Sequence, residues 1–267
     1  AQIEVALDRG RIASVTADGP RSLPLLELEL ELKDGPVDAL FSLAQQLGKA
    51  AQLHPVTGSK AERGYALFQD RPAKPVKATP VVLQPQQHPV DAFRAAALVC
   101  LVQLQANEAG VLDSDNIEFL HQARVAIRRL RAALRVFAPA LPAKFVLRWS
   151  TAWKALAQNL GDARDHDVFR TTLLPGLVAL LGPRDAARLQ TWARTEGAAA
   201  TAAARDSLSS RDYSDHLLAF TRAVLRLKGG KSETSAPPFR RWALQRLRQR
   251  HSKLLQQIRK ADLFDPV

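Results

Sequence analysis

The sequence contains a single cysteine and no methionine, and both shortages narrow what the protein can be. With Cys100 alone no internal disulfide can form, and its apolar neighbours predict a buried thiol rather than a reactive one. A reducing, cytoplasmic location is therefore expected. Because methionine is missing even at position 1, we expect the chain to be a piece of a longer protein.

Long apolar runs are also missing. The longest, Ala95 to Leu104 and Leu173 to Leu181, are shorter than the roughly 18 to 20 residues of a membrane span, so no transmembrane helix is predicted. The N-terminus lacks the basic start and apolar centre of a signal peptide. With 267 residues, 46% of them hydrophobic, the chain can form one large domain or two ordinary ones.

Acidic residues are scarce in the second part of the chain. The net charge is +12, yet residues 1–88 hold ten basic and ten acidic residues, so the whole excess lies in residues 89–267. Residues 119–161 contain no acid, while cations accumulate there: Arg124, Arg128, Arg129, Arg131, Arg135, Lys144, Arg148 and Lys154. A segregated excess of one sign predicts an anionic partner for that part.

The pattern of elements divides the chain into three parts. Alternating residues predict antiparallel strands in residues 1–33, then a helix over residues 37–50 and a short strand over Gly64–Phe68. Five prolines in residues 70–90 predict a linker. Residues 91–267 are typical of long helices joined by short loops. The predicted fold is mainly α, an antiparallel helical bundle preceded by a small antiparallel β segment of a partial tunnel or barrel.

One predicted helix gathers cations on one side. At 100° per residue, five side chains fall within about 80° and form an arginine stripe about 21 Å long: His121, Arg124, Arg128, Arg131 and Arg135. Ala123, Ile127, Leu130 and Leu134 occupy a separate face that can be buried. An ordinary solvated face usually mixes signs, because like charges at i,i+4 repel. The stripe therefore indicates an anionic ligand.

The chemistry of the stripe favours phosphate. Arginine offers planar donors that suit phosphate oxygens and stays charged at any working pH. Nucleic acid is one candidate, and a nucleic-acid-binding basic helical protein is the alternative function. However, the stripe has no aromatic residue for base stacking, and the sequence has no helix-turn-helix, zinc-finger or RNP pattern. Inorganic polyphosphate is a chain of phosphates without bases that need a stacking partner, so it fits the stripe better.

Two motifs in the helical part resemble a known family. Residues 121–131 match H-x-x-R-V-x-x-R-R-L-R, and residues 160–168 match L-G-x-x-R-D-x-D-V, the signatures of the CHAD family (conserved histidine α-helical domain). The resemblance implies a helical polyphosphate-binding module in two similar halves, with cations lining a central channel. The implied phosphate contacts are His121, Arg124, Arg128, Arg131, Arg135, Lys154 and Arg164. The second half would begin where this chain ends, so we expect a half-built channel.

The residues of the second motif also suggest roles in helix capping. Gly161 is expected to end one helix and Asp162 to cap the next. Asp165 and Asp167 favour the positive end of that next helix, and we expect them also to orient arginines of the stripe. The basic residues of the last helix, 239–260, spread around its polar side, so only a weak second contact with phosphate is expected there.

The N-terminal part resembles the later half of a CYTH domain, a triphosphate tunnel hydrolase. The matching stretches are residues 3–10, 27–31 and 59–65. The resemblance implies Mg²⁺ or Mn²⁺ ligands at Glu27, Glu29 and Glu31, a water-positioning catalytic role for Asp8, and triphosphate binding by Lys60 and Arg63. The family's opening E-x-E-x-K strand would lie before Ala1, so half of the tunnel wall is expected to be missing.

These resemblances predict three units, a partial CYTH domain over residues 1–69, the linker over residues 70–90 and a CHAD domain over residues 91–267. The parent protein would hydrolyse inorganic triphosphate, whereas this chain alone is expected to bind polyphosphate and not to cleave. Polyphosphate and the parent's triphosphate are the expected partners, with no membrane and no specific nucleic acid. Association with polyphosphate granules in the cytoplasm is a further expectation.

Overall fold

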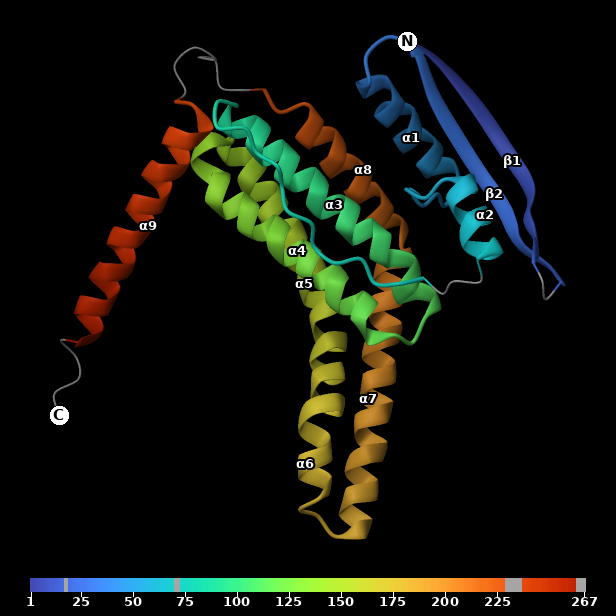
Figure 1. The fold of residues 1–267 in the computed structure, drawn as a ribbon, viewed down its shortest axis with the longest axis vertical. Coiled ribbons are helices and arrows are strands. Elements are labelled where there is room, and N and C mark those ends of the chain that lie inside the picture. Colours follow the sequence, from blue (N-terminus) through green and yellow to red (C-terminus); the bar gives the residue numbers. More distant parts are fainter. Residues whose placement is uncertain (17–18, 70–72, 229–236, 263–267) are drawn as a thin grey trace.

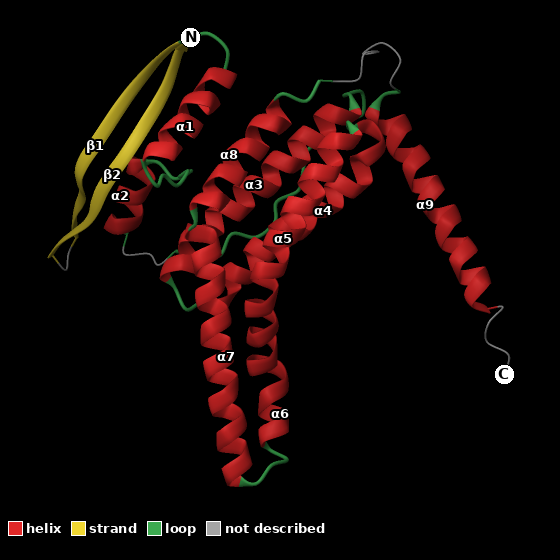
Figure 2. Cartoon of the chain, turned by 180° about the vertical axis from the view of Figure 1, so that it is seen from behind, coloured by secondary structure: helices red, strands yellow, loops and turns green. Residues whose placement is uncertain are grey.

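The structure is a computed structural model that describes residues 1–16, 19–69, 73–228 and 237–262. A β-hairpin and two helices lie beside a longer helical body, and the last helix extends away from it (Figure 1; seen from behind in Figure 2). The elements in chain order are β1 (Gln2–Thr16), β2 (Gly19–Asp34), α1 (Asp38–Ala50), α2 (Lys60–Phe68), α3 (Pro89–Asp113), α4 (Ile117–Phe137), the 3-10 helix η1 (Ala138–Ala140), α5 (Ala143–Val168), the π-helix η2 (Phe169–Leu173), α6 (Leu174–Val178), α7 (Pro183–Ser209), α8 (Arg211–Leu225) and α9 (Phe239–Asp262). This arrangement confirms the predicted fold class.

Strands β1 and β2 form an antiparallel hairpin in which Asp8 lies opposite Glu27. Because successive side chains alternate between faces, one face carries the carboxylates of Glu4, Asp8, Glu27, Glu29 and Glu31, and the other carries Leu7, Leu26, Leu28, Leu30 and Leu32. The leucine-bearing face is open in places, since Leu7 is 68% and Leu26 76% exposed. Helix α1 lies between β2 and α8, as Figure 1 shows.

Residues 60–68 form helix α2, so the strand predicted for Gly64–Phe68 is wrong. The helix begins with a capping box: the Ser59 hydroxyl accepts from the Glu62 backbone N–H at 3.1 Å, and the Glu62 carboxylate accepts from the Ser59 N–H at 2.8 Å. Two backbone donors at the helix start are thereby satisfied. This upstream signal outweighs the β-propensity of the aromatic residues Tyr65 and Phe68.

Residues 143–168 form one continuous helix, α5, so the break predicted at Gly161 and Asp162 is also wrong. Asp162 is exposed inside the helix and caps nothing. The helical geometry changes only at η2, just before Pro175. Packing of α5 on α4 and α7 holds the helix through Gly161, because tertiary contacts override a weak local propensity.

Helix α3 is long and apolar enough to cross a membrane, judged by length and composition alone. In this structure 56% of the most apolar 18-residue stretch of α3 is buried against the rest of the protein. The central helix of a helical bundle can be equally long and apolar. Phe93, Leu101 and Leu104 belong to the core around which the bundle packs. Cys100 is buried as predicted, and burial raises the pKa of its thiol.

The N-terminal unit is tied to the bundle by polar contacts. Arg222 of α8 donates to both carboxylate oxygens of Asp38, at 2.7 Å and 2.5 Å, and thereby lowers the pKa of that carboxyl. His54 Nε2 lies 2.9 Å from the buried carboxylate of Glu108, which also accepts from the Tyr213 hydroxyl. These contacts join α1 and the segment after it to α3 and α8.

Part of the predicted linker also lies against the bundle. The backbone N–H of Val76 donates to Asn107 Oδ1 at 2.9 Å, and Asn107 Nδ2 donates back to the Val76 carbonyl at 3.0 Å. Further along, the Gln87 carbonyl accepts from the backbone N–H of Phe239 at 2.9 Å. Residues 70–72 of this segment lie outside the described residues.

His216 provides a test of the core through pH. Its ring packs edge-on against Trp149 and Trp153, and burial, followed by the charge of Arg148, lowers its pKa from 6.5 to about 4. Between those two values the unfolded chain binds the proton and the folded chain does not, so stability falls as pH decreases through this window. We expect His216→Gln to lose less melting temperature between pH 6.5 and 4 than the wild type. Equal losses in thermal melts would contradict this.

Candidate anion-binding pocket

Helix α4 positions the arginine stripe by burying its opposite side. Asn116 caps the start of the helix, because its side chain accepts from the Glu118 backbone N–H at 3.0 Å. The predicted apolar face is buried: Ala123, Ile127, Leu130 and Leu134 are each at most 1% exposed. Because this face is fixed in the core, the stripe must lie on the side away from it.

Four members of the stripe meet a further arginine, Arg164, in one cavity between α4 and α5. The cavity has a volume of about 380 Å³, and we call it the arginine pocket. Its lining consists of His121, Arg124, Val125, Arg128, Arg131, Ala157, Gln158, Arg164 and Val168. Of the residues expected to bind phosphate, Arg135 and Lys154 are exposed and lie outside this lining.

The arginines of the pocket form no ion pair with a carboxylate in the described part of the chain. Arg124 Nη1 donates to the Ala157 carbonyl at 3.3 Å, a neutral acceptor. Within the ranges that the structure describes, no carboxylate forms an ion pair with His121, Arg124, Arg128, Arg131 or Arg164. No ion-paired carboxylate in the described ranges therefore cancels the charge of the pocket. The charge of Arg164 acts on the pKa of the buried Asp167 carboxyl, but these two side chains form no ion pair.

Arg129, although it belongs to the first motif, is directed elsewhere. Its Nη1 donates to Gln103 Oε1 and its Nη2 to the Thr79 carbonyl, both at 2.8 Å. It thus fastens the linker segment onto α3 and α4. Sequence reasoning did not predict four residues of the pocket lining: Val125, Ala157, Gln158 and Val168. For Ala157 the available signal was its position two helical turns before Arg164, which places both residues on one face of α5.

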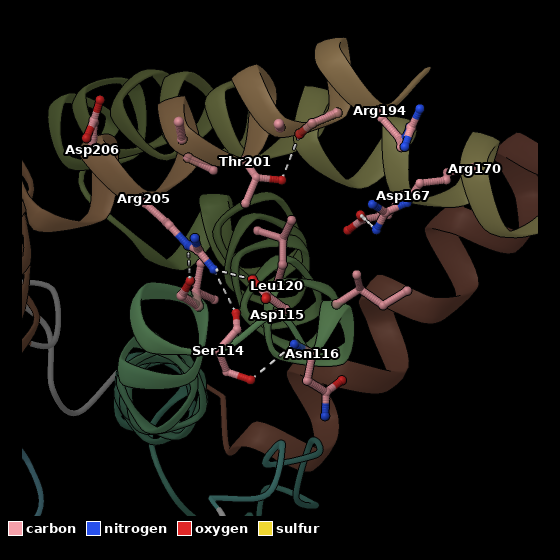
Figure 3. Close-up of a pocket in the computed structure, with 16 residues that line it drawn as sticks. Ser114, Asp115, Asn116, Leu120, Asp167, Arg170, Arg194, Thr201, Arg205 and Asp206 are labelled. Carbon is pink, nitrogen blue, oxygen red and sulfur yellow. Dashed lines mark hydrogen bonds and ion pairs between the residues drawn. The ribbon is translucent and has the colours of Figure 1, made fainter. Parts of the chain in front are cut away.

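The two aspartates of the second motif do not orient the stripe. Asp167 is buried in another cavity, of about 530 Å³, where its closest basic partner is Arg170 at 3.5 Å (Figure 3). Desolvation raises the pKa of the Asp167 carboxyl, and the nearby arginines offset part of that effect. Asp165 is exposed. The hypothesis that these side chains orient stripe arginines is therefore wrong, because α5 turns Asp167 away from the arginine pocket.

The residues implied by the CYTH resemblance also gather on one face, but as ion pairs. Lys60 Nζ contacts Glu29 at 2.6 Å and also contacts Asp8, and these two carboxylates raise its pKa. Arg63 contacts Glu27. The fourth carboxylate, Glu31, pairs with Lys33 at 2.8 Å.

This pairing bears on whether a metal ion fits. A metal site needs several carboxylates that converge on one point, whereas each of these is turned toward a cation. Over the part of the chain that the structure describes, no group of three or more His, Cys, Asp or Glu side chains could hold a metal ion. Glu27, Glu29 and Glu31 in this arrangement therefore do not fit Mg²⁺ or Mn²⁺.

The protein is a helical bundle with an arginine-lined pocket between α4 and α5. Residues 95–266 match the family model of the CHAD domain, and the chain belongs to the CHAD family. It is also similar to a solved structure, the CHAD domain from the plant Ricinus communis, with 26% identity and a TM-score of 0.57. That match covers 70% of this chain and 61% of the plant chain.

A curated relative matches a smaller part. The chain is 39% identical over 66 residues to an inorganic triphosphatase of Haemophilus influenzae. This alignment covers 25% of the chain and 18% of that protein, so the chain spans less than a fifth of its length.

Proposed function

We propose that the chain binds inorganic polyphosphate in the arginine pocket. One observation carries the proposal: His121, Arg124, Arg128, Arg131 and Arg164 line a single cavity without a carboxylate partner in the described ranges. Keeping like charges close costs free energy, which a phosphate chain offsets by neutralising several cations at once. Guanidinium groups can also donate paired hydrogen bonds to phosphate oxygens.

The surroundings of the pocket favour a long anion over a single phosphate. Arg135 lies one helical turn beyond Arg131 on α4, and Lys154 lies one turn before Gln158 on α5. Both side chains are exposed outside the pocket, where the continuation of a polymer could reach them. The pocket lining contains no Phe, Tyr or Trp, so a nucleic acid would find no large aromatic ring there for base stacking.

A competition titration tests this proposal. Labelled long-chain polyphosphate is titrated with the chain, and then unlabelled polyphosphate, DNA or RNA is added at equal phosphate concentration. We expect polyphosphate to displace the label and nucleic acid to displace it poorly, with affinity decreasing as salt increases. Equal displacement by DNA or RNA would favour the nucleic-acid alternative, and no binding of the label would refute the proposal.

We further propose that residues 1–69 belong to a CYTH triphosphatase unit whose intact parent hydrolyses inorganic triphosphate. Support comes from the similarity to an inorganic triphosphatase and from the shared face of Asp8, Glu27, Glu29, Lys60 and Arg63. In this proposal residues 70–90 link the unit to the CHAD domain over residues 91–267.

This chain by itself is expected to leave triphosphate intact. Lys60 pairs with Asp8 and Glu29, Arg63 with Glu27, and Lys33 with Glu31, and among the described residues these carboxylates form no group that could hold a metal ion. We expect no phosphate release above the uncatalysed background in Mg²⁺ or Mn²⁺. A colorimetric phosphate assay checks this, and sustained release that Glu27→Gln abolishes would contradict it.

A further inference from the structure

Gly161 lies inside α5, where a glycine needs an explanation. The helix continues on both sides of Gly161. Glycine lowers helix stability relative to alanine, because its backbone loses more conformational freedom when the chain folds. No positive φ is required there, since the glycines with positive φ in the described ranges are Gly19 and Gly35. The reason must therefore come from what lies next to the missing side chain.

The neighbour of Gly161 is the guanidinium of Arg124. A Cβ at position 161 would lie 2.9 Å from Arg124 Nη1, closer than real Cβ atoms approach other heavy atoms. The same Nη1 donates to the carbonyl of Ala157, one turn earlier on α5. The guanidinium thus rests across the backbone of α5, in a notch that exists because residue 161 has no side chain.

Other glycines inside helices do not have this contact. A Cβ at Gly176 would meet nothing within 4 Å, and one at Gly197 would make an ordinary contact of 3.8 Å with the Cβ of His166. At Gly110 the neighbour is an aromatic ring. Among these four helical positions, Gly161 alone lies against a cation of the arginine pocket.

We propose that Gly161 is a positioning residue for the phosphate site, which fixes where Arg124 presents its charge. The inference rests on the proposed binding of polyphosphate and adds a residue that does not itself line the pocket. A methyl group at position 161 would push the guanidinium off the Ala157 carbonyl and away from α5. Because Arg124 is flexible at this end, the push would change the binding geometry without breaking the core.

The test uses the full chain with Gly161→Ala and, as a matched control, Gly176→Ala. We expect Gly161→Ala to weaken binding of long-chain polyphosphate about tenfold, the scale of one displaced charge-assisted hydrogen bond. Its melting temperature should stay equal to the wild type or rise, because alanine is the better helix former. Gly176→Ala should leave affinity unchanged.

A double-mutant cycle with Arg124→Ala separates positioning from a general effect on the fold. Once the guanidinium is absent, Gly161→Ala should have no further effect on affinity. The inference is overturned if Gly161→Ala binds like the wild type, if its effect persists beside Arg124→Ala, or if it lowers the melting temperature. Failure of the wild type to bind would instead refute the proposed function, and this inference with it.

Discussion

Changing Arg124, Arg128 and Arg131 together to glutamate is expected to weaken polyphosphate binding at least a thousand-fold. All three side chains line the arginine pocket, and none has a carboxylate partner in the described structure. Each charge-assisted hydrogen bond contributes about 1.5 to 3 kcal/mol, and three lost bonds exceed the roughly 4 kcal/mol of a thousand-fold change. Repulsion between the new carboxylates and phosphate adds to the loss.

The matched control for this variant reverses three exposed arginines of α7: Arg184, Arg188 and Arg194. They lie outside the arginine pocket, so both variants carry the same net charge and differ only in where it was changed. We expect the control to bind with a small loss that disappears at higher salt, because distant charges act through a screened field. Binding curves that fall equally for both variants would mean that net charge alone holds the polymer.

Replacing Gly110 by alanine is expected to destabilise the folded protein by about 3 kcal/mol, at the upper end of the usual cost of overpacking. Gly110 of α3 faces the ring of Phe119 on α4, and an added Cβ would lie only 2.1 Å from Phe119 Cδ1. Phe119 is 2% exposed and belongs to the core, so its ring cannot move aside. Urea unfolding of the variant and the wild type measures the difference.

The same contact predicts a compensating change. Phe119→Leu removes the ring that collides with residue 110, so the double variant should lose less stability than the two single losses combined. Gly176→Ala serves again as the control, because an added methyl there meets open space. If the two losses of stability simply add in the double variant, the effect of Gly110→Ala does not arise from its contact with Phe119.

The sequence alone predicted the features that depend on local periodicity. The spacing of Ala123, Ile127, Leu130 and Leu134 indicated a buried face, and all four are buried in the structure. The alternation in β2 likewise placed Glu27, Glu29 and Glu31 on one face. Spacing of this kind follows from 3.6 residues per helical turn and two per strand, so no distant contact is needed to read it.

Errors arose where a residue has different roles in different surroundings. Gly161 was expected to end a helix, because glycine is common at that position, yet it lies in a helix interior beside Arg124. Asp167 was expected to face the stripe, yet it lies buried beside Arg170. The sequence around each of these two residues does not indicate which side chain of another helix will lie next to it.

The sequence by itself determined which helix carries the cations and which side of it is buried. Only the tertiary structure decided which cations share the pocket: it brings Arg164 in from α5, turns Arg129 toward α3 and leaves Arg135 outside. The physical reason is that the direction of a side chain on its own helix is a local property. The distance between side chains on two helices depends on how those helices pack and in which register.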